Sequence, residues 1–117
     1  MTNQELGLIG ENLGAIFLKK KGHRIIQRNF TWNRGEIDII TTFEDKIHIT
    51  EVKTRQTAEI GEPWRAVTRT KQKQIIKVAD QYLKAKNLNK DAVFNIISIV
   101  HNQYKTDLEF IPDAFTP

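Results

Sequence analysis

The residues of this chain best suited to chemistry are Asp38, Glu51 and Lys53. Asp38 lies in an apolar run at 37–40, and Glu51 and Lys53 lie in an alternating run at 47–54. The polar stretch between the two runs is typical of a turn, so the pattern predicts a β-hairpin. Alternate side chains on a strand share a face, so Glu51 and Lys53 face one way, and Asp38 faces the same way from the neighbouring strand. An unpaired buried carboxylate costs several kcal/mol, so such a face needs a compensating cation.

A divalent metal ion between two carboxylates, with an ammonium beside it, is suited to phosphodiester hydrolysis. Mg²⁺, or Mn²⁺ in its place, takes oxygen ligands, commonly one or two carboxylates together with waters and substrate phosphate oxygens. Asp38 and Glu51 would hold this ion. The charge of Lys53 would orient the attacking hydroxide and offset the negative charge that develops on the phosphate. Glu36, at a strand end, is a further candidate ligand.

An ordered series of residues around this core resembles a known protein family. The series comprises Gly10-Glu11, Arg28-Asn29, Gly35-Glu36-Ile37-Asp38, Glu51-Val52-Lys53-Thr54-Arg55, Gly61, Ala66-Val67 and Lys71. It extends over nearly the whole chain and resembles the YraN-like family of small bacterial proteins. Asp38, followed after 13 residues by the start of Glu51-Val52-Lys53, is similar to the D…ExK core of the PD-(D/E)xK nuclease superfamily. The YraN-like family is itself similar to the archaeal Holliday-junction resolvases.

The resemblance implies a fold and roles for further residues. The fold would be α/β, a restriction-endonuclease-like αβββαβ(β) core forming one nuclease-like domain over residues 1–117. The carbonyl of Val52 would complete the metal site, and Glu11 would hold a metal-bound water or a second ion. Because the resolvases cut two strands symmetrically, a homodimer is expected by analogy. The family pattern commonly has aspartate where this chain has Asn95, so no auxiliary role is assigned to that position.

The first predicted element is a helix over 3–21, capped by Thr2 or Asn3. Its predicted apolar stripe consists of Leu6, Ile9, Leu13, Ile16 and Phe17. Glu11 lies on a neighbouring face among glycines. Glycine inside a helix costs about 1 kcal/mol relative to alanine, so these glycines indicate the close approach of another backbone or of a ligand. Glu11 is therefore either an exposed helix glutamate or part of a site, and the glycines and the resemblance favour the site.

The remaining elements predict a mixed sheet. In chain order they are a strand over 23–32, the hairpin over 35–55, a loop over 56–62 that borders the site, a helix over 63–86, a strand over 91–100 and a short strand over 108–111. A strand–helix–strand passage favours a right-handed crossover, so the strand over 91–100 should run parallel to the second strand of the hairpin. We therefore expect an antiparallel meander extended by a parallel strand, with helices packed over the sheet.

Basic residues are concentrated in the second predicted helix. Residues 63–90 carry eight lysines and arginines against one acid, whereas residues 1–62 carry nine of each. The candidates for binding the phosphate backbone of DNA are Lys71, Arg55, Arg65, Arg69 and Lys73. The alternative is a solvated helix face. Lys71, at the edge of the apolar stripe, either extends to solvent or points at an anion, and the second is favoured. Trp64 is interpreted as a core residue rather than a base-stacking platform.

Composition excludes several classes of protein. The chain has 117 residues, a net charge of +4 and no cysteine, which excludes disulfides and cysteine-based zinc sites. No apolar run approaches a membrane span and the start of the chain carries no basic secretory region, so the reducing cytoplasm is the expected compartment. The histidines lack ligand spacing and are interpreted as structural. A glycine-rich phosphate loop is absent, which argues against an NTPase.

Three functions fit these observations. The first is a Mg²⁺-dependent endonuclease that hydrolyses DNA phosphodiester bonds, with branched or damaged DNA as a candidate substrate. The second is a nucleic-acid-binding module that retains the nuclease fold without turnover and explains the basic helix equally well. The third is an interaction protein whose charges all lie on the surface. The complete acid–acid–lysine set favours the endonuclease, because drift after loss of activity would tend to erase at least one of the three residues.

Overall fold

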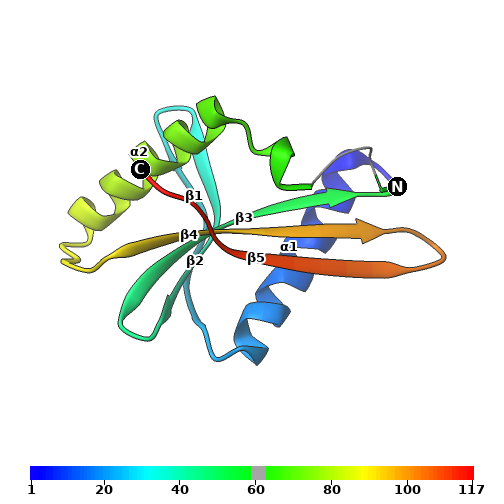
Figure 1. Ribbon diagram of the computed structural model, residues 1–117, viewed down its shortest axis with the longest axis horizontal. Helices are drawn as coiled ribbons and strands as arrows, with labels where there is room; N and C mark the ends of the chain where they lie inside the picture. Colours follow the sequence, from blue (N-terminus) through cyan, green and yellow to red (C-terminus); the bar gives the residue numbers. More distant parts are fainter. Residues whose placement is uncertain (59–62) are drawn as a thin grey trace.

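The computed structural model describes residues 1–58 and 63–117 of the chain (Figure 1). Its elements in chain order are α1 (Asn3–Lys20), β1 (Arg24–Trp32), β2 (Gly35–Phe43), β3 (Lys46–Arg55), the 3₁₀ helix η1 (Pro63–Ala66), α2 (Arg69–Ala85), β4 (Ala92–His101) and β5 (Thr106–Phe115). In this part of the chain, no helix is both long enough and apolar enough to span a membrane. Gly61 of the family-like series, and the side chain of Trp64, lie outside the described residues.

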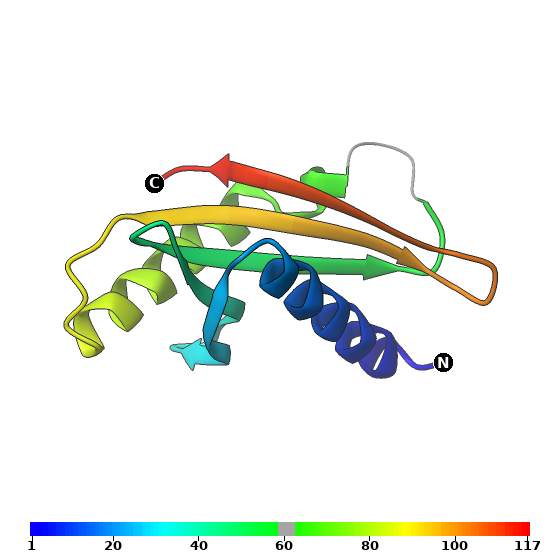
Figure 2. The ribbon, with the colours of Figure 1, turned by 90° about the horizontal axis from the view of Figure 1, so that it is seen from below.

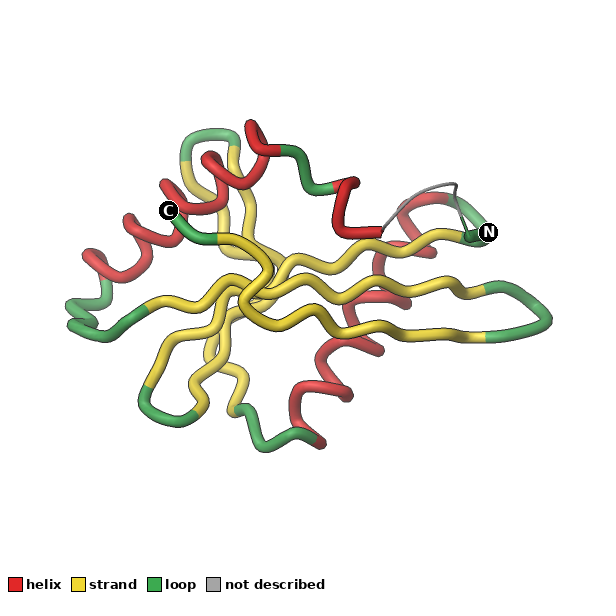
Figure 3. Tube along the Cα trace, viewed as in Figure 1, coloured by secondary structure: helices red, strands yellow, loops and turns green. Residues whose placement is uncertain are grey.

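The strands form one mixed sheet in the order β1-β2-β3-β4-β5. Neighbouring strands pair antiparallel except β3 and β4, which are parallel, with Ile47 opposite Ala92 and Arg55 opposite Val100. The crossover between β3 and β4 contains α2, as the strand–helix–strand pattern predicts. The expected α/β fold with an αβββαβ(β) order is therefore confirmed (Figure 3).

The two strands of the central hairpin are paired near its turn and separate toward its open end. Glu44 and Asp45 form the tight turn, both with positive φ (51° and 63°), which matches the twist of a two-residue hairpin loop. From this turn β2 and β3 pair only as far as Ile39 and Thr50. Beyond that point β2 remains paired with β1 while β3 continues beside β4, and the two diverge (Figure 1). This divergence gives the side chains before Ile39 on β2 and after Thr50 on β3 room to meet between the strands.

The helices bury different faces of the sheet. On β4, Phe94 and Ile96 belong to the cluster that contains the apolar face of α2, whereas Ile97 and Ile99 belong to the cluster that contains Leu18 of α1. Since alternate residues of a strand point to opposite faces, the two helices cover opposite sides. Figure 2 shows α1 running below β3, β4 and β5.

The buried face of α1 matches the predicted apolar stripe only in part. Thr2 caps the helix with Glu5 in a capping box, as expected, but the buried residues are Leu6, Gly10, Gly14, Ala15 and Leu18. Ile16 is 51% exposed. The stripe is confirmed at Leu6, and Leu13 and Phe17 pack partly buried against the core. It was wrong for Ile16 because α1 packs through its glycine face, where a short approach to the sheet is possible. A Cβ on Gly10 would lie 1.7 Å from the Thr54 Oγ1, so only glycine fits there.

Two further boundaries differ from the sequence expectations. The helix expected over 63–86 is divided, because the Thr68 side chain accepts a hydrogen bond from the Lys71 backbone N–H (3.3 Å) and starts α2 at Arg69. The last strand, expected over 108–111, spans ten residues and pairs with β4 from Thr106 to Ile111 and again at Phe115, with a register shift in between. Its Pro112 is compatible with this because β5 is an edge strand.

Candidate functional site

Three carboxylates meet where β2 leaves β3. Glu11 from α1 and Glu36 and Asp38 from β2 each place one oxygen within 4.8 Å of the others. Glu36 is exposed, Asp38 is 9% exposed, and Glu11 is intermediate. Burial, together with the negative charges of Asp38 and Glu36, raises the pKa of Glu11 above its ordinary value, although its hydrogen bond with Asn29 and the charge of Arg28 oppose this shift. The three acids therefore form a crowded anionic group that favours a cation.

Asn29 holds two of these carboxylates together. Its Nδ2 donates to Glu11 Oε1 (2.7 Å) and to Glu36 Oε1 (3.1 Å). Asn29 adopts a left-handed backbone conformation (φ 52°), which asparagine tolerates better than most residues. Sequence reasoning assigned Asn29 no role, although it stands in the family-like series. No spacing rule identifies an amide on one strand that bridges an acid on a helix and an acid on another strand.

Arg28 approaches the same oxygen of Glu11 as Asn29 does. Its Nη2 is 3.9 Å from Glu11 Oε1 and donates to Asn12 Oδ1 (2.9 Å). Its Nε has no hydrogen-bond partner among the described residues. The guanidinium therefore keeps donor capacity beside the carboxylate group.

Asp38 belongs to this group of three carboxylates and also contacts Glu51. Its Oδ2 accepts a hydrogen bond from the backbone N–H of Val52 (2.8 Å), which replaces a strand-to-strand hydrogen bond at the point where β2 and β3 separate. Burial, a hydrogen-bond contact with Asp38 and the charge of Asp38 raise the pKa of Glu51 to about 9, against the opposing charges of Lys53 and Lys71. Asp38 and Glu51 thus converge, as the sequence predicted.

Two lysines complete the group. Burial lowers the pKa of Lys53 to about 8, and its contact with the Lys71 side chain acts in the same direction, while Glu51 and Asp38 oppose it. Lys71, from α2, therefore points toward the site. This is the orientation that the sequence favoured over extension to solvent. We call Glu11, Glu36, Asp38, Glu51, Lys53 and Lys71 together the acid–lysine cluster.

The close packing of α1 explains why residues so distant in sequence meet. Gly10 contacts Thr54 of β3, and a Cβ on Gly14 would lie 3.2 Å from a methyl group of Val52. Larger residues at these positions would move α1 away from β3. The two glycines therefore set the distance at which Glu11 reaches Asp38. The glycine pattern correctly indicated a close approach, although the contacts are with side chains of β3.

The donor set fits a hard divalent cation. Mg²⁺ binds oxygen ligands at about 2.0–2.1 Å, so two ligand oxygens on one ion lie at most about 4.2 Å apart. The oxygens of Glu11, Glu36 and Asp38, all within 4.8 Å of one another, need to move only slightly to share such an ion. Glu51 contacts Asp38 but does not belong to this group of three carboxylates. Asp38 could therefore contribute to two neighbouring positions, one with Glu11 and Glu36 and one with Glu51.

The basic residues proposed for DNA contact do not form one surface. Arg55 lines a groove of about 580 Å³ that runs from the start of α1 past Glu11 and Lys53 to Gln56 and Thr57. The described part of the loop after β3 therefore borders the site through Gln56 and Thr57, as expected. Arg65 is exposed on η1, Arg69 is bonded to Gln72 and to the Thr116 carbonyl, and Lys73 lines a separate cleft with Trp32.

A second polar group lies between the turn of the central hairpin and β5. A hydrogen bond joins His23 Nδ1 and Thr41 Oγ1 (2.6 Å), and the Asn95 Nδ2 donates to His48 Nδ1 (3.1 Å) and to Thr50 Oγ1 (3.3 Å). The Asn95 Oδ1 accepts from the Asp113 backbone N–H (3.0 Å). We call these residues the histidine network. Asn95 is fully buried in it, which gives this position a structural use.

Comparison with known proteins identifies relatives over the whole chain. Residues 10–99 match the model of Uncharacterised protein family UPF0102. A UPF0102 protein of Clostridium novyi is 41% identical over 116 residues, covering 97% of each chain. One of Chlorobium phaeobacteroides is 42% identical over 117 residues, covering 94% of this chain and 92% of the relative, and one of Geobacter metallireducens is 40% identical over 116 residues, covering 98% and 95%. The YraN-like resemblance is confirmed at this level, and the chain belongs to the UPF0102 family.

Proposed function

We propose that this protein is a Mg²⁺- or Mn²⁺-dependent endonuclease that hydrolyses DNA phosphodiester bonds. The observation that carries the proposal is the acid–lysine cluster itself: four carboxyl groups and two ammonium groups from α1, β2, β3 and α2 gathered where two strands separate. Structural carboxylates are normally paired or exposed, and strongly shifted pKa values concentrate at functional sites. The similarity of Asp38 and Glu51-Val52-Lys53 to the PD-(D/E)xK nucleases supports the same reaction.

Each residue of the cluster has a task in this proposal. Asp38 would hold the metal ion together with Glu51 and the Val52 carbonyl, and Glu11 and Glu36 would hold a second ion or its waters. When bound, the ion supplies charge stabilisation and an acidified water. Lys53 and Lys71 hold positive charge beside the carboxylates, where it stabilises the charge that develops on the phosphate.

DNA with branches or damage is the proposed substrate class, on the strength of the similarity to junction resolvases. A homodimer would present two such sites to two strands, as that similarity implies. The groove that Arg55 lines, next to Lys53 and Glu11, offers a place for the DNA backbone beside the cluster. A nucleic-acid-binding module without turnover would use the same groove, so catalysis itself has to be measured.

The test is a cleavage assay with matched lysine variants. Wild type, Lys53→Gln and Lys90→Gln are incubated with single-stranded, duplex, flap and four-way-junction DNA in Mg²⁺, Mn²⁺ or EDTA. Lys90 is the control because it pairs with Asp45 at the far turn of the hairpin. We expect metal-dependent cleavage that falls at least ~100-fold in Lys53→Gln, about 2.7 kcal/mol of transition-state stabilisation, and is unchanged in Lys90→Gln.

The other outcomes are equally informative. Equal cleavage by wild type and Lys53→Gln would mean a contaminating nuclease and would reject the assignment. Salt-dependent binding without cleavage of any substrate would replace the endonuclease by the binding module.

A further inference from the structure

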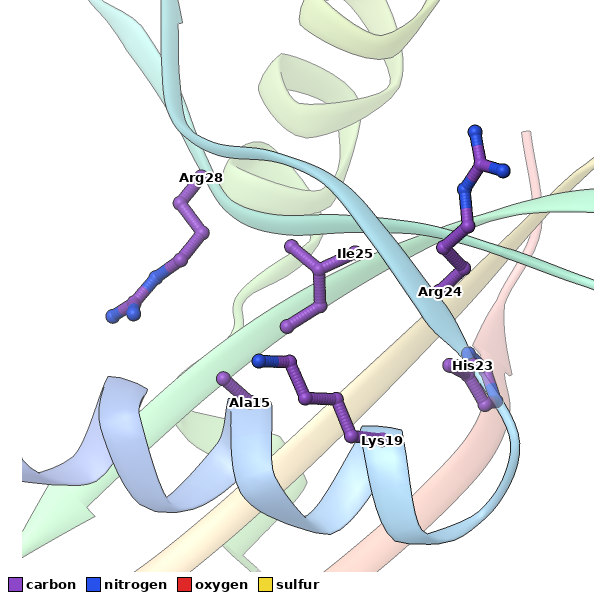
Figure 4. A pocket seen from close by; sticks show the side chains of 6 residues that line it. All are labelled: Ala15, Lys19, His23, Arg24, Ile25 and Arg28. Carbon is purple, nitrogen blue, oxygen red and sulfur yellow. The ribbon is translucent and has the colours of Figure 1, made fainter.

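A second groove lies beyond the acid–lysine cluster, between α1 and β1. It has a volume of about 480 Å³ and is lined by Ala15, Lys19, His23, Arg24, Ile25 and Arg28 (Figure 4). Among the described residues, none that lines this groove is acidic. Burial lowers the pKa of His23 to about 4, so at neutral pH the charge of the groove comes from Lys19 and the two arginines, and it is positive.

The two grooves lie along one row of α1. Asn3, Gly7, Glu11, Ala15 and Lys19 are spaced four residues apart, and residues at this spacing are neighbours on a helix surface. The first three line the groove beside Arg55, and the last two line the second groove. Glu11 is therefore the residue of the first groove that lies nearest to the second along this row. At 1.5 Å per residue the row is about 24 Å long, which equals about seven steps of 3.4 Å along one strand of a duplex.

The second groove adjoins the cluster through Arg28. This residue lines the groove, and its Nη2 is 3.9 Å from Glu11 Oε1. Figure 4 shows the side chains of Lys19 and Arg28 directed into the space between α1 and β1, whereas the guanidinium of Arg24 points away from α1 at the rim. Gly7, in the first groove, would have no atom within 4 Å of an added Cβ, so that part of the row is open.

We propose that the second groove binds backbone phosphates of the same DNA strand whose target phosphodiester lies at the acid–lysine cluster. The strand then runs along the α1 row, enters through one groove, passes Glu11 and leaves through the other. A strand held on both sides of the cluster is cut in its interior and needs no free end. This inference rests on the proposed endonuclease function and specifies the path of its substrate.

The test compares two double variants that remove the same charge. Lys19→Gln/Arg24→Gln alters the groove, and Lys20→Gln/Lys105→Gln is the control. Lys20 is the exposed neighbour of Lys19, one residue farther around α1, and Lys105 pairs with Asp107 at the β4–β5 hairpin. All four side chains are exposed, so each variant should keep the wild-type circular dichroism and unfolding midpoint. Binding of a fluorescent duplex oligonucleotide in EDTA is measured at salt concentrations from 50 to 200 mM. Over this range, proteins that make many phosphate contacts lose about 10³- to 10⁵-fold in binding affinity.

The groove variant is expected to lower the steepness of log K against log salt by about 1–2, since each lost phosphate contact removes about 0.9. The control is expected to keep the wild-type slope. Covalently closed circular DNA, which has no ends, should be nicked by wild type in Mg²⁺.

Two results would overturn the inference separately from the function. If both double variants share the wild-type slope while wild type still cuts DNA, the second groove does not hold the strand. If wild type cuts linear DNA only from its ends, the strand does not pass the cluster. If wild type neither binds nor cuts DNA, the proposed function fails, and this inference fails with it.

Discussion

The sheet carries two buried polar groups that are built in opposite ways. In the histidine network, hydrogen bonds join the polar side chains, and burial lowers the pKa of His23 and of His48, which disfavours the charged form of both rings. In the acid–lysine cluster, like charges are gathered and the pKa of Glu51 and of Glu11 is raised. Buried polar groups are usually hydrogen-bonded for stability. Crowded charge, rather than polar burial, therefore marks the candidate site.

The largest expected effect is a loss of cleavage, without a loss of stability, when Glu51 of the acid–lysine cluster is substituted. Glu51→Gln should lower the cleavage rate at least ~100-fold, about 2.7 kcal/mol. Its free energy of unfolding should stay equal or rise, because a buried carboxyl next to Asp38 is replaced by a neutral amide. Nicking rates and urea unfolding curves measure the two quantities, with the exposed carboxylate variant Asp45→Asn as control. A loss of stability with unchanged activity would make this cluster structural.

A substitution in the histidine network should have the opposite effect, lowering stability and leaving cleavage nearly unchanged. Asn95→Ala leaves the Asp113 N–H, His48 and Thr50 without their partner and should cost about 1–3 kcal/mol of unfolding free energy. Cleavage by the folded variant should stay within a few-fold of wild type. Asn89→Ala, at an exposed asparagine, is the control and should change neither. If Asn95→Ala instead abolished cleavage while remaining stable, the histidine network would serve activity rather than stability, contrary to the role assigned to it.

A pair of glycine variants tests how α1 is held against the cluster. Gly10→Ala places a methyl group against Thr54 and should destabilise the protein by about 1–3 kcal/mol. Gly7→Ala meets no atom within 4 Å and should stabilise α1 by up to about 1 kcal/mol. Urea unfolding measures both. Equal effects at the two positions would contradict the close contact between Gly10 and β3.

The smallest effects are the pH dependences, which should have opposite signs. The contribution of His23 to unfolding free energy is present above 6.5, its ordinary pKa, and is lost as pH falls through about 4. The contribution of Glu51 is present below 4.5, its ordinary pKa, and is lost as pH rises through about 9. In EDTA, stability relative to His23→Gln should therefore be larger at high pH, and stability relative to Glu51→Gln larger at low pH. Parallel trends would show that the two groups do not differ in this way.

The sequence indicates the fold and the cluster to different extents. Strand order, the parallel crossover and the Thr2 capping box follow from local patterns, and the meeting of Asp38 with Glu51 follows from strand alternation. The alternation itself is only approximate, because Ile37 and Ile40 both belong to the α2-side cluster.

The remainder depends on tertiary packing that no local pattern specifies. The apolar stripe of α1 identified its buried face only in part, since close contact through Gly10 leaves Ile16 exposed. Asn29 bridges Glu11 and Glu36 only because β1 and α1 come together. Likewise, Lys71 reaches Lys53 only after Thr68 has set the start of α2.

Calorimetric titration with Mn²⁺ tests the central claim most directly, because it needs no substrate. Wild type should bind Mn²⁺, Asp38→Asn should lose that binding because Asp38 belongs to both candidate positions, and Asp45→Asn should bind as wild type does. No heat from wild type, or equal binding by Asp38→Asn, would contradict a metal centre at the acid–lysine cluster.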